Sequence, residues 1–145
     1  MSVQLKNYHA ADTMGRSMPE LVVKVYDGAI GSLHQAREYY RAEKLQAGYE
    51  SMEKVKKFIV HLYTTLDEEK GGEIAEKLAK IYVYIMEQIN IIQATKDLKM
   101  IDDAIEILNN VRDGWVQLVE NVNLDKSKEK ESNSEQPTRS LSLSV

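Results

Sequence analysis

Three histidines, His9, His34 and His61, are the side chains best suited to metal, acid–base or phosphoryl chemistry in this sequence. No two of them are three or four residues apart, so they cannot form the paired ligands that one helix face offers to a metal ion. A helical histidine can instead accept a phosphoryl group, and His34 and His61 are the candidates. Neither has the following lysine and glycine that leave room for that group, so a solvated histidine is the simpler interpretation. A histidine phosphotransfer bundle is kept as an alternative.

Other catalytic patterns are missing from the sequence. The chain has no cysteine, which excludes thiol catalysis and cysteine-ligated zinc or iron–sulfur centres. It also lacks the Glu-x-x-His pattern of di-iron bundles, a glycine-rich phosphate loop and a serine nucleophile elbow. We therefore predict a protein that is not an enzyme and that has no catalytic residue, metal site or cofactor.

Charge and hydropathy predict a soluble cytoplasmic protein. The 145 residues carry a net charge of −4 with both signs interspersed, so there is no basic surface for nucleic acid. The N-terminus, residues 1–6, lacks the apolar run of a secretory signal. No segment approaches the roughly 20 apolar residues of a membrane span, so we expect no membrane insertion.

The distribution of prolines and glycines predicts an all-α protein. Only two prolines occur, Pro19 and Pro137, and little between them would break a helix. Ser17 and Glu20 have the spacing of a capping box, in which each side chain bonds to the other residue's backbone N–H. Pro19 lies in the first turn, where no N–H is needed. A helix is therefore predicted to begin at Ser17.

Apolar residues recur every three or four positions in four segments, which is typical of helices with one buried face. The predicted helices cover residues 17–42, 45–66, 74–94 and 97–122. Gly71 and Gly72 supply a turn between the second and third helices, and Asp97 is the predicted N-cap of the fourth. Because the connections are short, the helices must pack as an antiparallel, up-down-up-down four-helix bundle.

The two ends differ in composition from the bundle. Residues 1–16 show no sustained period and are predicted to form a flexible N-terminal arm. Residues 123–145 are rich in serine, glutamate and lysine, and they cannot bury enough apolar surface to offset the entropy of ordering. We predict a disordered C-terminal tail after a bundle that spans residues 17–122.

The second and third helices carry more apolar residues than one core face needs. The extra residues lie on flanks beside the core stripe, except Val83, which points away from the core. A groove between these helices would accept the apolar face of an amphipathic helix. Packing at helix boundaries or in a symmetric oligomer is the alternative. The predicted partner-binding residues in the bundle are Tyr49, Val60, Tyr63, Ala79, Tyr82, Val83 and Met86.

Several short motifs resemble one family over about residues 8–116. In chain order they are Tyr8, Ser17, Leu21, Tyr26-Asp27-Gly28-Ala29-Ile30, Leu66-Asp67, Gly71-Gly72-Glu73-Ile74-Ala75, Leu78, Arg112-Asp113 and Trp115. Their order and spacing resemble those of the flagellin-specific export chaperones, the FliS family. Met18 and Pro19 stand where that family usually has proline and glutamate, a local change at the first helix start.

The resemblance implies a cytoplasmic chaperone that binds the C-terminal segment of flagellin. Such a chaperone prevents premature polymerisation before flagellar type III secretion and needs no ATP. The resemblance also implies the flagellar export gate as a partner. It assigns Tyr8 to the arm tyrosine that covers part of the client site when the site is empty.

Overall fold

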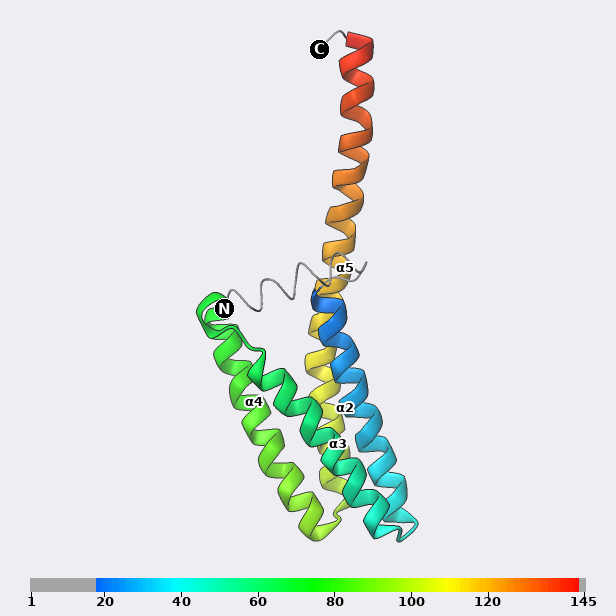
Figure 1. Ribbon diagram of the computed structural model, residues 1–145, viewed down its shortest axis with the longest axis vertical. Helices are drawn as coiled ribbons and strands as arrows, with labels where there is room; N and C mark the ends of the chain where they lie inside the picture. Colours follow the sequence, from blue (N-terminus) through cyan, green and yellow to red (C-terminus); the bar gives the residue numbers. More distant parts are fainter. Residues whose placement is uncertain (1–17, 144–145) are drawn as a thin grey trace.

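The computed structural model describes the backbone of residues 18–143, and side chains to residue 128 except those of Glu68 and Lys126. Within this range the chain forms four helices (Figure 1): α2 (Met18–Arg41), α3 (Leu45–Thr64), α4 (Glu68–Thr95) and α5 (Leu98–Leu143). Each helix packs against its neighbours in sequence, and α2 also packs against α5. Figure 1 shows the direction alternating from each helix to the next. The predicted all-α, up-down-up-down four-helix bundle is confirmed.

The core is built from one apolar stripe of each helix. In α4 the stripe includes Ile85, Ile89 and Ile92, which are fully buried and keep the three- and four-residue spacing of a helix face. The corresponding residues of the other helices are also buried: Tyr26, Ala29, Leu33 and Ala36 of α2, Met52, Val55 and Ile59 of α3, and Ile101 and Leu108 of α5. These stripes fix which face of each helix is left for other contacts.

Two helix starts are capped by aspartates. The Asp67 side chain accepts a hydrogen bond from the Lys70 backbone N–H at 3.0 Å, and a helical turn begins there. Gly72 then interrupts α4 with φ 54° and ψ −130°, a backbone conformation that favours glycine. The predicted glycine turn is therefore present, but α4 begins before it rather than after it. The Asp97 side chain accepts hydrogen bonds from the backbone N–H groups of Lys99 and Met100 at the start of α5, as predicted. The predicted cap at Ser17 lies outside the described residues.

Ion pairs fasten α2 to α5. Arg37 donates to both carboxylate oxygens of Asp102 at 2.6 and 3.2 Å, and this bonding lowers the pKa of Asp102. Arg112 donates to Asp27 at 2.5 Å, which joins two of the sequence motifs that lie 85 residues apart. No hydrogen bond or ion pair joins α4 to α5 among the described side chains. Ion pairs therefore stabilise the contact between α2 and α5, but not the contact between α4 and α5, among the described side chains.

The start of α4 lies away from α5. Figure 1 shows the turn between α3 and α4 standing apart from the upper parts of α2 and α5. Ile74 is 70% exposed there, although its spacing had predicted a core position. The reason is the divergence of the two helices, which leaves an inward-spaced residue without a neighbour to cover it.

The end of α5 also differs from the prediction. The helix continues to Leu143, past the end of the bundle predicted at Val122. Extending an existing helix avoids the cost of nucleation, and residues 123–136 contain no glycine or proline. In Figure 1 this part of α5 projects beyond the other helices. The predicted arm, residues 1–16, lies outside the described residues.

Gly28 allows α2 and α3 to approach closely, and we predict that Gly28→Ala destabilises the bundle. A Cβ atom at this position would lie 2.5 Å from Cζ of Phe58, which packs against the core. Such overpacking should lower the free energy of unfolding by about 1–3 kcal/mol. Gly31→Ala in the same helix is the control, because a Cβ there meets nothing within 4 Å. Urea denaturation of both variants checks this, and equal stabilities would contradict the steric explanation.

Candidate partner-binding groove

An open apolar groove runs between α3 and α4. Its walls are Val60 and Tyr63 from α3 and Val83, Met86, Glu87 and Asn90 from α4, and its volume is about 290 Å³. The exposed fractions of Val60, Tyr63 and Val83 are 43%, 45% and 46%. Apolar residues therefore line both sides of one depression, as at sites where a protein binds a partner. Four of the predicted binding residues are brought together here.

The groove stays open because the two helices are joined further along their seam. There the Gln93 side chain donates to Glu53 at 2.9 Å and to the Tyr49 carbonyl at 3.5 Å, and it accepts from Lys56 at 3.4 Å. The hydrogen bond from Gln93, followed by that from Lys56 to the same carboxylate at 2.9 Å, lowers the pKa of Glu53. The groove residue Val83 is a short side chain, so it cannot reach across from α4 to fill the space.

A second depression lies on the other side of α4. It is lined by Ala79, Lys80, Val83, Tyr84 and Glu87, so it shares Val83 and Glu87 with the groove. Tyr84 is exposed on this side, as is Ile91 seven residues further along the helix. Val83 and Glu87 therefore form an outward-facing ridge of α4, with apolar residues on both sides of it.

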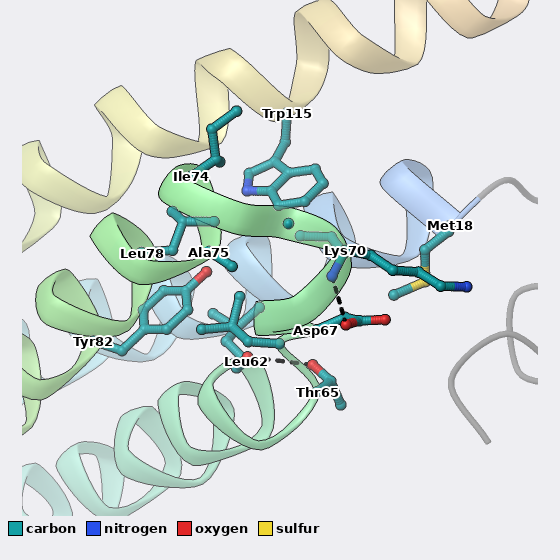
Figure 2. A pocket seen from close by; sticks show the side chains of 13 residues that line it. Met18, Leu62, Thr65, Asp67, Lys70, Ile74, Ala75, Leu78, Tyr82 and Trp115 are labelled. Atoms are coloured by element: carbon teal, nitrogen blue, oxygen red, sulfur yellow. Dashed lines mark hydrogen bonds between the residues drawn. The ribbon is translucent and has the colours of Figure 1, made fainter. Parts of the chain in front are cut away.

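An end cavity of about 260 Å³ opens where α4 diverges from the bundle (Figure 2). Its lining comes from all four helices and the turn after α3, and includes Met18, Leu66, Ile74, Leu78, Tyr82 and Trp115. Trp115 is the only tryptophan of the chain. The end cavity holds only one exposed large apolar residue, Ile74, whereas three of the groove residues are exposed: Val60, Tyr63 and Val83. The groove is therefore the leading candidate site.

Tyr82 is a core residue, not a groove residue. It is 1% exposed, and its hydroxyl shares a 2.5 Å hydrogen bond with the hydroxyl of Tyr26 in α2. Burial raises the pKa of both tyrosines above the ordinary value. The prediction that Tyr82 lies on an exposed flank is wrong, because its position four residues after Leu78 and three before Ile85 completes the core stripe.

Two other predicted residues lie away from the groove. Tyr49 is exposed, but it lies eleven residues before Val60, a distance of about 16 Å along a helix. Ala79 is half-buried and lines the depression on the far side of α4. Tyr8 lies outside the described residues. The sequence prediction also missed Glu87 and Asn90, although each lies on a helix face with Val83, at spacings of four and seven residues.

The geometry offers little for catalysis. His34 and His61 are both exposed on separate helices. No group of three or more metal-ligating side chains occurs among the residues that the structure describes. In the same range, no helix has the length and apolarity needed to cross a bilayer. The main surface feature of the described bundle is therefore the apolar groove between α3 and α4.

The comparisons with known proteins name the family. The model of the flagellar protein FliS matches residues 1–122. The flagellar secretion chaperone FliS of Salmonella typhimurium is 30% identical over 106 residues, covering 72% of this chain and 78% of that protein. The Vibrio cholerae chaperone is 29% identical over 99 residues, covering 68% and 73%. A crystal structure of a bacterial flagellar chaperone matches with a TM-score of 0.70 at 25% identity, covering 81% of this chain and 95% of that one.

The chain belongs to the FliS family of flagellar proteins. Its role is that of an export chaperone in flagellar secretion, in agreement with the resemblance in the sequence motifs.

The Tyr26–Tyr82 pair yields a second prediction, tested by a double-mutant cycle. Tyr82→Phe leaves the buried Tyr26 hydroxyl without its hydrogen-bond partner, so unfolding free energy should fall by about 1–3 kcal/mol. Tyr26→Phe should have a similar effect. The double variant should lose less than the sum, with a coupling of about 0.5–3 kcal/mol. Strictly additive losses in urea denaturation would show that the two hydroxyls do not stabilise each other.

Proposed function

We propose that this chaperone holds flagellin in the cytoplasm before export by binding its C-terminal segment in the α3–α4 groove. The observation that supports this is the contiguous apolar lining of Val60, Tyr63, Val83 and Met86, in which Met86 is half-buried and the other three are exposed. A client segment that drives filament assembly must itself be apolar on one face, so covering it blocks premature polymerisation. The flagellar export gate is the partner to which the loaded complex would be delivered.

The proposed binding needs no nucleotide. An amphipathic client helix would place residues spaced three and four apart into the groove. Each apolar side chain removed from water contributes about 1.5–3 kcal/mol when fully buried, so a few anchors can exceed the entropic cost of docking. The core stripe holds α4 in place before the client arrives, which keeps that cost low.

We predict that Val60→Glu and Val83→Glu weaken binding of a flagellin C-terminal fragment by at least roughly tenfold, because docking would bury a carboxylate against an apolar helix. Both positions are exposed, so thermal stability should change little. Leu45→Glu is the matched control at an exposed site outside the groove. Ile85→Ala should instead destabilise the fold by about 2–5 kcal/mol.

Calorimetry and thermal melting of the same variants make the comparison. If the parent binds the fragment and both groove variants bind it with the same affinity, the client binds outside the groove. No binding by the parent at micromolar concentration would remove the proposed client. A parent that forms a dimer through the groove would favour the structural-oligomer alternative.

Tyr8 supports a related proposal about the arm, residues 1–16. The arm directly precedes α2, and we propose that Tyr8 covers part of the groove when no client is bound, so that the client must displace it. Tyr8→Ala should then speed client association, because a competitor is removed. Its unfolding free energy should stay within about 1 kcal/mol of the parent. Stopped-flow fluorescence of a dye-labelled flagellin C-terminal fragment can follow association, and slower association in the variant would contradict the competition.

A further inference from the structure

Glu87 is a lone carboxylate in the middle of the apolar surface of α4. Its neighbours on the helix surface, three and four residues away, are all uncharged: Val83, Tyr84, Asn90 and Ile91. It lines both the groove and the depression on the other side of the ridge. Among the described residues, nothing forms an ion pair with it.

A partner that covers this surface must also cover Glu87. Removing a carboxylate from water is expensive unless a cation or several hydrogen-bond donors replace the water. The groove lining offers two neutral polar side chains, Tyr63 and Asn90, and no cation. On the other side of the ridge the depression contains Lys80, but this lysine pairs with Glu76 at 3.9 Å and not with Glu87. The replacement must therefore come from the partner. Lysine and arginine suit this place, since their apolar stems can lie along Val83 while the charged end reaches Glu87.

We propose that Glu87 determines specificity in the groove by selecting a client helix with a lysine or arginine within one turn of its apolar anchors. This rests on the proposed function and adds the client's charge pattern to it. The apolar residues alone would accept any amphipathic helix of suitable size. An unpaired carboxylate penalises helices without the cation, so the discrimination comes partly from rejecting the wrong partners.

The first experiment measures affinity for a flagellin C-terminal fragment by calorimetry. Glu87→Gln keeps the size of the side chain and should lower affinity by roughly tenfold, and Glu87→Lys should lower it further through like-charge repulsion. Glu106→Gln and Glu106→Lys make the same charge changes on an exposed glutamate of α5, outside the groove. Both controls should bind within about twofold of the parent if direct pairing matters rather than net charge.

The second experiment locates the cation on the fragment. Each lysine or arginine of the fragment is replaced in turn by glutamate. One replacement should weaken binding to the parent and restore binding to the Glu87→Lys variant. Raising the salt concentration should weaken binding of the parent more than that of Glu87→Gln, because only the parent retains the pair.

The failures are distinguishable. If Glu87→Gln binds as tightly as the parent, or if no charge reversal restores Glu87→Lys, the specificity role is overturned while flagellin binding stands. If the parent does not bind the fragment, the proposed function falls, and with it the role of Glu87. If the parent sediments as a dimer that Glu87→Lys disperses, the occupant is a second copy of this chain and the proposal is wrong.

Discussion

The hydrogen bond between the hydroxyls of Tyr26 and Tyr82 fixes how α4 is rotated about its axis. Successive residues of a helix are about 100° apart, so holding Tyr82 inward turns Val83 toward the surface. Met86, one turn further along, then lies beside α3. The apolar residues of the groove are exposed because the tyrosine next to them is buried. A buried polar pair between α2 and α4 thus determines which surface remains free for a partner.

The positions of the other polar contacts explain why this surface is open. Arg37 and Arg112 fasten α5 to α2, and Gln93 joins α3 to α4 beyond the groove. The first half of α4 therefore relies on its core stripe and on Tyr82. Such an arrangement gives a rigid frame with a preformed groove, which reduces the ordering cost of binding.

The sequence predicted the fold well because the apolar spacing is regular. The spacing of Ile85, Ile89 and Ile92 is compatible with only one buried face of α4. The short connections between helices force antiparallel packing. The same pattern misassigned two residues. Tyr82 was placed on a flank, although it completes the stripe, because the width of the buried face depends on the partner helices. Ile74 was placed in the core, but the divergence of α4 from α5 leaves it exposed.

Other features depend on tertiary structure that spacing does not encode. Val60 and Met86 were identified as candidates from their excess apolar character, yet their meeting in one groove follows from the α3–α4 packing. Glu87 was missed because a charged residue on a helix surface is ordinary until its surroundings are known. The continuation of α5 beyond Val122 was missed because polar composition was weighed above helix propagation.

The most direct test of the groove is an NMR titration of the chaperone with a flagellin C-terminal fragment, observing backbone amides and valine methyl groups. The largest shift changes are predicted at Val60, Tyr63, Val83 and Met86. Little change is expected at Val23 and Val116, which line a separate depression between α2 and α5. Changes concentrated at Val23 and Val116, with none in the groove, would contradict this assignment.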